Sequence, residues 1–464
     1  MGAILRWRER RTERRLQRDA PRGLLQHAIT EPIADVDESD LSADLRPLVP
    51  ALGLREYWYP TVPARRVPRD RPLFWQMLGE ELVLFRDEEG NVAALSDVCP
   101  HRGASLAGGK CHYPGTVSCP YHGAVFDGTG ECRAFLTEGP SSKMPDILRA
   151  RSYPTIELRG WVFTWMGEGE PAPPEEDIPP EFFEGEQTVL LTTYTYWPMP
   201  WLIALENQGD SHNATYAHLN SLQQLTRDCA RPRTPFGPRV HTVDDRALVP
   251  VRGGRNPYAD EAGQVPYQLE YPGVGGVWPL GRWRQLVWRA FRPWYRFVVF
   301  SDWRKARSAF PYATADEWAD GAGTYCWHLP GIVRINSGIF MYTRFAVPVA
   351  PNLSRIVYVH NRRVRTTFGR ALVRLWFAMY FNWWKNYNFS GQDNRIASPT
   401  RYWTPENLAP TDSMMVAIRR MVVFGSRDRQ RERRAAQGTP LVVPVTVPAR
   451  DKVRPSVPER SRRG

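Results

Sequence analysis

Two short segments each carry one cysteine and one histidine, and these residues are the best suited to chemistry. The first reads Cys99-Pro-His101-Arg-Gly and the second reads Cys119-Pro-Tyr-His122-Gly, with seventeen residues between His101 and Cys119. Two thiolates and two imidazoles in this pattern are typical of a [2Fe–2S] cluster in which the thiolates bind one iron and the imidazoles bind the other. Because neutral imidazoles carry less negative charge than thiolates, they raise the reduction potential of the cluster. The pattern therefore predicts a site that passes single electrons.

Two other uses of these side chains have to be compared with a cluster. A closed zinc site accepts two cysteines and two histidines, but zinc fingers usually place both cysteines in one segment and both histidines in the next. A disulfide framework would need more than the six cysteines of this 464-residue chain, and the nearby Cys111 and Cys132 have no matching histidines. The spacing therefore favours the cluster.

The residues that flank these ligands resemble the two cluster-binding loops of Rieske domains. They read Cys-Pro-His-Arg-Gly-Ala from Cys99 and Cys-Pro-Tyr-His-Gly-Ala-Val-Phe-Asp from Cys119. One departure is Ala124, which stands where many such domains have tryptophan and which should alter packing beside the cluster rather than ligation. The resemblance implies a Rieske-type [2Fe–2S] cluster held by Cys99, His101, Cys119 and His122.

A second group of candidate ligands lies between Leu205 and Leu219, where Asp210, His212 and His218 fall within nine residues. Two imidazoles and one carboxylate on one face of a metal leave three positions open, and Fe(II) in this arrangement binds oxygen beside a substrate. Two histidines taken at random would more often be surface or core residues. Their place downstream of a predicted cluster favours a metal site.

Here the sequence resembles the Rieske non-haem iron oxygenases, whose iron-binding helix reads Asp, two residues, His, four residues, His. An alignment without gaps puts Asp210 at the acid, Asn213 at the first histidine and His218 at the second, so His212 lies one residue early. Imidazole binds Fe(II) far better than a carboxamide does, which favours His212 over Asn213. A degenerate site that binds iron poorly is the third alternative. Either spacing needs a bend or a π-bulge in the helix.

The resemblance also implies the remaining site residues. The segment from Asn388 to Ile396, which contains a Gln-Asp393 pair, resembles the part of these oxygenases that supplies the aspartate ligand. Iron would then be held by His212, His218 and Asp393. In this family the helix acid, here Asp210, is thought to hydrogen-bond a cluster histidine of one subunit and an iron histidine of its neighbour. That role implies a homo-oligomer, and a trimer is the family expectation.

The elements that must position these residues fall into two regions of an α+β chain. Residues 51–168 alternate short strands with turns, as in the hairpin over 81–95, and predict an all-β Rieske domain with the cluster loops at hairpin tips. Residues 181–427 predict a catalytic domain with an antiparallel sheet flanked by helices. The strands expected there cover 188–196, 332–335, 339–346 and 354–360, and the helices cover 201–221, 368–386 and 411–423.

The ends of the chain carry much of its net charge of +12. Residues 1–50 form a basic extension, and residues 428–464 form a basic tail rich in Pro and Arg for which disorder is expected. No recognition motif accompanies the charge, so nucleic-acid binding is not expected. The Pro- and Glu-rich segment 170–180 suits a linker. The N-terminal residues lack the apolar run of a signal peptide, which favours a cytoplasmic location.

Together these features predict the terminal oxygenase component of a Rieske oxygenase system. Such an enzyme uses O2 to hydroxylate or demethylate a substrate, and the high aromatic content favours a bulky, apolar, aromatic or polycyclic one. The cofactors expected are a Rieske [2Fe–2S] cluster and mononuclear Fe(II). Because the chain has no Gly-x-Gly-x-x-Gly fingerprint, NAD(P)H would act only through a separate reductase, with a ferredoxin as a further partner.

Other interpretations stay open at this point. One is a Rieske electron-transfer protein with a degenerate iron site, and another is a Rieske-type desaturase or an oxygenase of pigments or sterols. The stretch 278–300 interleaves aromatic residues with arginines and could line a substrate channel or contact a membrane surface. Membrane contact is not favoured, and no segment predicts a transmembrane helix.

Overall fold

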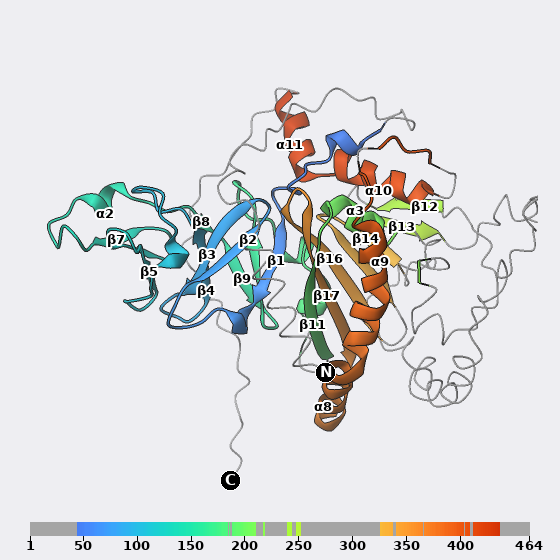
Figure 1. Cartoon of the computed structure of the whole chain (residues 1–464), viewed down its shortest axis with the longest axis horizontal. Coiled ribbons are helices and arrows are strands. Elements are labelled where there is room, and N and C mark those ends of the chain that lie inside the picture. The colour runs from blue at the N-terminus through green and yellow to red at the C-terminus, as the bar shows by residue number, and fades with distance from the viewer. Residues whose placement is uncertain are drawn as a thin grey trace, which may run out of the picture.

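The computed structural model describes residues 44–183, 185, 188–209, 217–218, 239–243, 247–251, 325–336, 340–364, 366–402, 404–408 and 412–436. Within them, three small antiparallel sheets form one region and a seven-stranded antiparallel sheet forms the other (Figure 1). The α+β class expected from the sequence is confirmed.

The three small sheets come from the N-terminal part of the chain. Their strand orders are β1-β10-β9, β2-β3-β4-β8 and β5-β6-β7. Their bounds are β1 Trp58–Pro63, β2 Leu73–Met77, β3 Glu80–Arg86, β4 Val92–Ser96, β5 Thr116–Ser118, β6 Ala124–Asp127, β7 Cys132–Phe135, β8 Ser152–Tyr153, β9 Thr155–Leu158 and β10 Trp161–Trp165. Four short helices precede or connect these strands: η1 Arg46–Leu48, η2 Ala64–Arg66, η3 Leu106–Gly108 and α2 Met144–Ile147.

The hairpin of β3 and β4 shows why the chain turns where the sequence predicts. Asp87 Oδ1 accepts a hydrogen bond from the Asn91 backbone N–H at 2.7 Å, and Gly90 at φ +85° supplies the left-handed residue of the turn. The two strands then pair antiparallel from Leu82 opposite Ser96 to Arg86 opposite Val92.

The large sheet has the strand order β11-β17-β16-β15-β14-β13-β12. The bounds are β11 Thr188–Trp197, β12 Arg239–Val243, β13 Ala247–Val251, β14 Tyr325–His328, β15 Ile332–Asn336, β16 Met341–Ala350 and β17 Leu353–Arg363. Alternate residues of β11 face opposite sides: Val189 and Leu191 pack among helical aromatic residues, whereas Leu190 and Tyr194 pack toward the small sheets. Because both faces are covered, every residue of β16 is buried.

One hydrophobic core crosses from the small sheets to the large sheet. It joins Trp75 and Trp161 of the small sheets to Trp197 and Phe345 of the large sheet. Backbone bonds reinforce this contact, because the Leu78 N–H donates to the Pro348 carbonyl at 2.9 Å. The two regions are therefore packed together as one unit.

The segment expected to be a linker is part of this packing. It contains η4 Pro174–Glu176 and is followed by η5 Pro180–Phe182. Asp177 is buried, accepts a hydrogen bond from the Trp58 backbone N–H at 3.0 Å and pairs with Arg427 at 2.8 Å. The prediction of a free linker is wrong, because the composition does not show that these polar residues find buried partners.

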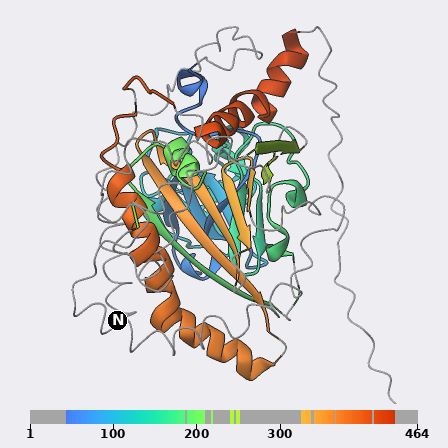
Figure 2. The same ribbon diagram turned by 90° about the vertical axis from the view of Figure 1, so that its right-hand side faces the viewer.

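The helices of the second region are α3 Trp201–Glu206, α8 Thr367–Trp376, α9 Ser390–Ala397, α10 Ser413–Phe424 and α11 Arg427–Ala436. Between α8 and α9 the chain stays helical through two π-helical segments, η8 Phe377–Phe381 and η9 Trp383–Phe389. The helices expected over 368–386 and 411–423 are confirmed. Figure 2 shows the helical run from α8 to α9 along one edge of the large sheet.

Helix α11 corrects the disorder expected from residue 428. Its arginines find acidic partners on the small sheets and in the connecting segment: Arg427 pairs with Glu176 at 2.8 Å and Arg431 pairs with Glu56 at 3.2 Å. Among the described residues, no helix combines the length and apolar character needed to cross a membrane.

Candidate active site

The two cysteine–histidine segments form loops of the same construction. In the first, the Cys99 N–H donates to the Ala104 carbonyl and the Gly103 N–H donates back to Cys99, both at 2.8 Å. In the second, the Cys119 N–H donates to the Ala124 carbonyl at 2.8 Å and the Gly123 N–H donates back to Cys119 at 3.2 Å. The glycines adopt φ +74° and +69°, a conformation that favours glycine. The repeated Gly therefore closes each loop behind its cysteine.

The loops bring like ligands together. The Nδ1 atoms of His101 and His122 lie 3.1 Å apart, and the Cys99 and Cys119 thiols are in hydrogen-bonding contact. Two ligands at about 2.1 Å from one tetrahedral ion lie about 3.4 Å apart, so the imidazole spacing suits a shared metal. A pair of imidazoles beside a pair of thiols fits the two irons of the predicted cluster.

Burial favours the neutral form of one ligand of each kind. It raises the pKa of the Cys99 thiol to about 11, with the neighbouring Cys119 sulfur adding to the effect. Desolvation lowers the pKa of His122, and the positive charges of His101 and Arg102 lower it further. The imidazole is therefore held in the neutral form that binds metal, and metal binding at the thiols releases protons.

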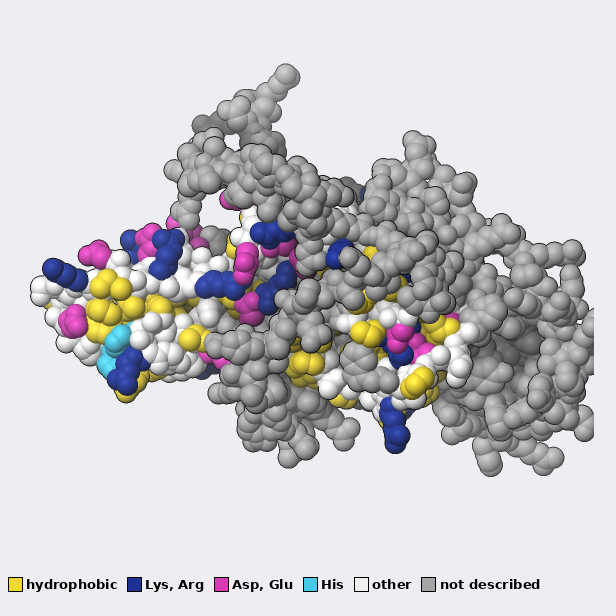
Figure 3. Space-filling view, turned by 90° about the horizontal axis from the view of Figure 1, so that it is seen from above, with side chains coloured by type: hydrophobic (Ala, Val, Ile, Leu, Met, Phe, Trp, Pro, Cys, Tyr) yellow, Lys and Arg dark blue, Asp and Glu magenta, His cyan; other side chains and the backbone are white. Residues whose placement is uncertain are grey.

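The cluster loops lie at an exposed end of the molecule. Figure 3 shows histidine side chains at the surface of this end, next to hydrophobic ones. The Tyr121 ring is 57% exposed, stacks on His122 with centroids 3.8 Å apart, and lies beneath the Arg102 guanidinium. Val98 and Leu136 are also exposed apolar residues near the two loops. This end therefore offers a partly apolar surface to another protein.

The second predicted site joins residues that are far apart in the sequence. His218 Nε2 lies 3.1 Å from Asp393 Oδ1 of α9, and both side chains are almost fully buried. The His218 ring stacks on Phe389 of η9 with centroids 3.7 Å apart. Asp393 Oδ2 and His218 Nδ1 are buried and find no hydrogen-bond partner among the described residues. A metal ion would satisfy buried oxygen and nitrogen atoms of this kind, so this pair of side chains fits mononuclear iron.

The other predicted ligands cannot be placed. Asp210, His212 and the alternative Asn213 lie outside the described residues. In the described part of the chain, no third His, Cys, Asp or Glu completes a metal-binding group with His218 and Asp393. The choice between His212 and Asn213 therefore remains a prediction.

Two residues that the sequence did not single out support this pair. Asn207, just after α3, donates its side-chain N–H to Asp393 Oδ1 at 3.3 Å and accepts from Arg344 at 3.5 Å. Arg344 is fully buried on β16, donates to the Ala204 carbonyl and lies 5.1 Å above the Trp197 ring. This chain of contacts holds the Asp393 carboxylate in position. Asn207 lies inside the stretch from Leu205 to Leu219 that the sequence singled out, whereas nothing in the sequence marked Arg344.

The π-helical turns lie directly before Asp393. Such turns gather at functional sites, and here they change which residues face the sheet. Phe377, Phe381 and Trp384 pack together against β11, while Phe389 meets His218. The sequence suggested a π-bulge near His212, which lies outside the described residues, and not in this helix.

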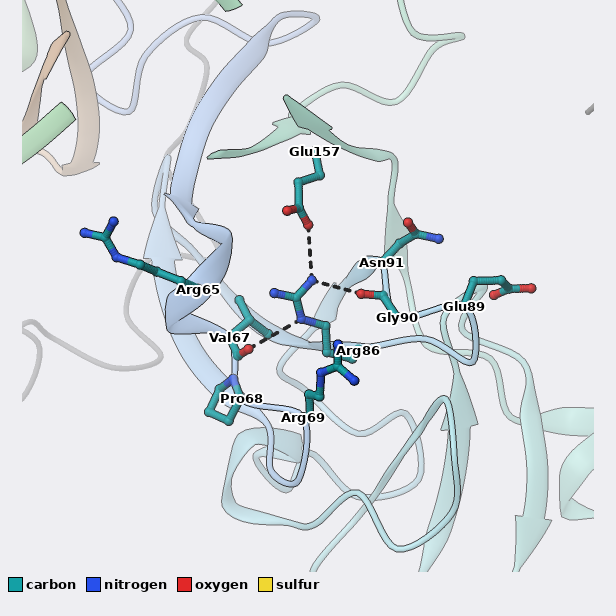
Figure 4. Close-up of a pocket in the computed structure, with 9 residues that line it drawn as sticks. All are labelled: Arg65, Val67, Pro68, Arg69, Arg86, Glu89, Gly90, Asn91 and Glu157. Carbon is teal, nitrogen blue, oxygen red and sulfur yellow. Dashed lines mark hydrogen bonds and ion pairs between the residues drawn. The ribbon is translucent and has the colours of Figure 1, made fainter. Parts of the chain in front are cut away.

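An open cavity of about 760 Å³ lies beside the turn between β3 and β4 (Figure 4). This cavity is not a substrate site for an apolar compound. Arg86 lies at its centre and donates to Glu157 Oε2 at 3.1 Å, to the Gly90 carbonyl at 2.9 Å and to the Val67 carbonyl at 3.4 Å. Its lining is largely charged: Arg65, Val67, Pro68, Arg69, Arg86, Glu89, Gly90, Asn91 and Glu157. The channel residues expected at 278–300 lie outside the described residues.

Residues 57–154 match the family described as Rieske [2Fe-2S] domain. This match includes both cysteine–histidine loops. Residues 57–154 of the chain therefore form a Rieske [2Fe–2S] domain. The resemblance read from the two loops is thereby confirmed.

Curated relatives of this Rieske protein include several oxygenases. The terminal oxygenase component of carbazole 1,9a-dioxygenase from Metapseudomonas resinovorans is 30% identical over 222 residues, which are 46% of this chain and 57% of that protein. Chlorophyllide a oxygenase from Chlamydomonas reinhardtii is 34% identical over 171 residues, or 36% of this chain and 25% of that protein. These matches span from a quarter to little more than half of the relatives' length.

Solved structures extend the likeness to the second region. The terminal oxygenase of carbazole 1,9a-dioxygenase from Nocardioides aromaticivorans IC177 superposes with a TM-score of 0.62 over 82% of this chain and 96% of that chain, at 21% identity. A complex of a carbazole-bound oxygenase with ferredoxin gives a TM-score of 0.61 at 20% identity, covering 87% of this chain and 98% of that one. The Rieske protein therefore has the fold of a terminal oxygenase.

Proposed function

We propose that this Rieske protein is the terminal oxygenase component of a Rieske oxygenase system that hydroxylates or demethylates a bulky apolar substrate. The observation that carries the proposal is the buried contact of His218 with Asp393, together with the paired imidazoles of His101 and His122. Two relatives support the substrate class, because they are named for the bulky compounds carbazole and chlorophyllide a.

The chain's residues would hold two metal groups. Cys99, His101, Cys119 and His122 would bind the [2Fe–2S] cluster, and His218 and Asp393, with His212, would bind Fe(II). When bound, the cluster supplies single electrons and Fe(II) supplies the activation of O2. Asn207 and Phe389 hold the carboxylate and the imidazole in fixed orientations, and the burial of both ligands keeps bulk water away from them.

The arrangement also supports partners for this protein. The exposed apolar side chains around the cluster loops suit a reductase or a ferredoxin as electron donor, and solved oxygenases of this fold occur in complexes with ferredoxin. In Figure 1 the cluster region lies at one end of the molecule and α9 lies beyond the large sheet. This layout supports a homo-oligomer, proposed as a trimer, in which Asp210 links a cluster histidine of one subunit to an iron histidine of the next.

The test is to measure iron and acid-labile sulfide per chain in protein purified without oxygen. We expect about three irons and two sulfides in the wild type. His218→Ala and Asp393→Asn should lower iron to about two per chain while the visible spectrum of the cluster persists, because the two sites use separate residues. Both variants should also lose oxidation of an aromatic substrate, measured as product formed per O2 consumed.

Further variants make the test specific. Asn207→Ala keeps the ligands and should weaken Fe(II) binding by about 10-fold or more, because the carboxylate loses its support. Gln208→Ala, at the next residue, is the matched control. A wild type that keeps about two irons per two sulfides after Fe(II) is added would contradict the oxygenase proposal and favour electron transfer.

A further inference from the structure

Helix α8 and its continuation into η8 expose a continuous apolar stripe. Its members, which we call the α8 stripe, are Phe368, Leu372, Leu375 and Met379, with exposed fractions of 74%, 49%, 55% and 67%. They follow one another at intervals of four, three and four residues, which places them on one face of a helix. Scattered apolar residues on a surface need no explanation, but an aligned set this exposed marks an interaction surface.

Another face of the same helix already packs in the protein. Val373, Trp376 and Phe377 belong to a cluster with Phe340 and Trp384. The α8 stripe is therefore not needed for attachment of the helix to the sheet. A surface helix of a water-exposed protein would carry polar residues there.

The α8 stripe is placed where a large flat partner can reach it. Figures 1 and 2 both show α8 projecting beyond one end of the large sheet, away from the cluster region. The residue before the helix, Thr366, caps it, because its hydroxyl accepts a hydrogen bond from the Gly369 N–H at 3.0 Å. This cap fixes the start of the helix, so that Phe368 lies in its first turn.

The charges around the α8 stripe all have one sign. Between residues 321 and 392 the sequence has no Asp or Glu at all. Basic residues lie on α8 and on the end of β17 that leads into it: Arg362, Arg363, Arg370 and Arg374. Half-buried Trp376, Tyr380 and Trp383 lie along the same helical run. A helix with an apolar stripe flanked by Trp and Tyr, and with arginines on its polar face, is typical of helices that lie at a lipid–water interface.

Charge also distinguishes lipid from a second copy of the chain. A two-fold contact through the α8 stripe would bring together two helices of like charge, with no acidic residue on either helix to offset the repulsion. Anionic lipid headgroups complement the same arginines. We propose that the α8 stripe binds this protein to the surface of an anionic membrane, with the helix lying in the interface rather than crossing it. This inference does not depend on the proposed oxygenase function.

The experiment is co-sedimentation of the full chain with phosphatidylcholine vesicles that contain or lack phosphatidylglycerol. We expect binding to the anionic vesicles that weakens with salt. Leu372→Ser/Leu375→Ser should reduce the partition coefficient about 10-fold or more, since two leucines no longer enter the interface. Arg370→Gln/Arg374→Gln should reduce binding to anionic vesicles and leave the weak binding to neutral vesicles unchanged.

The controls separate the stripe from other causes. Ile147→Ser replaces a similarly exposed apolar residue in α2, at 69% exposure, and should bind as the wild type does. A dye attached at Leu375→Cys should shift to shorter wavelength on addition of anionic vesicles. Equal vesicle binding by the wild type and Leu372→Ser/Leu375→Ser would assign binding to the basic chain ends and overturn the proposal. A stripe variant that changes the oligomer mass without changing vesicle binding would also overturn it, in favour of a second copy.

Discussion

At the residue scale, the chain places one histidine where it cannot easily take up a proton. His360 on β17 is buried among Phe340, Tyr342 and Phe381, and its Nε2 lies 3.3 Å from the Asn386 side-chain oxygen. Burial, opposed by the hydrogen bond with Asn386 and aided by the positive charge of Lys385, lowers the pKa of His360 to about 3. The neutral imidazole therefore belongs to the folded state.

This histidine predicts acid sensitivity of the fold. Between pH 6.5 and about 3 the unfolded chain binds a proton at His360 that the folded chain does not, so stability falls as the pH falls through this range. The contribution approaches about 1.4 kcal/mol per pH unit. His360→Gln should flatten the decline of the unfolding free energy between pH 6 and pH 4, as measured by urea denaturation. If both proteins show the same slope, the histidine is not the cause.

The residues proposed for the two metal sites differ in how far the sequence could reveal them. Each cluster loop is a local pattern, so Cys99 and His101 could be read directly. His218 and Asp393 are 175 residues apart, and only the family resemblance linked them. Arg344 could not be found, since a buried arginine on a strand looks like any other until its partners are known.

At the element scale, a buried ion pair attaches α10 to α3, the helix that directly precedes Asn207. Arg419 donates to Glu206 of α3 at 2.6 Å and to Glu406 at 2.6 Å. Burial raises the pKa of Glu206, and the guanidinium opposes this effect. The pair therefore fixes α3, and with it Asn207, against α10.

Removing this arginine should be costly. Arg419→Leu leaves a buried carboxylate without its partner, and we expect a loss of about 3–5 kcal/mol in unfolding free energy. The neighbouring Arg420, which lies over the Phe424 ring at 5.2 Å, serves as the control, and Arg420→Leu should cost about 1 kcal/mol or less. Similar losses in the two variants would mean that α10 is not held by this pair.

Elements with regular periodicity were predictable, and those decided by distant partners were not. The strands over 188–196 and 354–360 were expected from their β-branched residues, and the structure has them as β11 and β17. Composition pointed to a linker at 170–180 and to disorder from 428. Residues 170–180 and the described part of the tail, residues 428–436, form ion pairs with residues more than two hundred positions away, such as Asp177 with Arg427 and Arg431 with Glu56.

At the scale of the whole molecule, Arg355 of β17 joins the two regions. It is fully buried, donates to the Gln76 carbonyl of β2 at 2.7 Å and lies 4.1 Å above the Trp75 ring. Because the core is shared, we expect tryptophan fluorescence and far-ultraviolet circular dichroism to report one urea transition.

Arg355→Ala should lower the stability of both regions together. We expect a loss of about 2–3 kcal/mol, because the Gln76 carbonyl loses its donor and a cavity opens beside Trp75. Arg363→Ala, at the exposed end of the same strand, should change stability by about 0.5 kcal/mol or less. Two separate transitions in the wild type would contradict the shared core.

The core that crosses between the sheets also limits how such chains can be recombined. A chimera that exchanged only residues 51–168 with those of a relative would bring in a new partner for Trp197 and Phe345 and would break the bond from Leu78 to Pro348. The boundary between the two regions runs through the middle of the hydrophobic core rather than through a solvent-filled hinge. A segment exchanged between relatives would therefore have to include the matching face of the large sheet, so the region of small sheets and the region of the large sheet are expected to be inherited together.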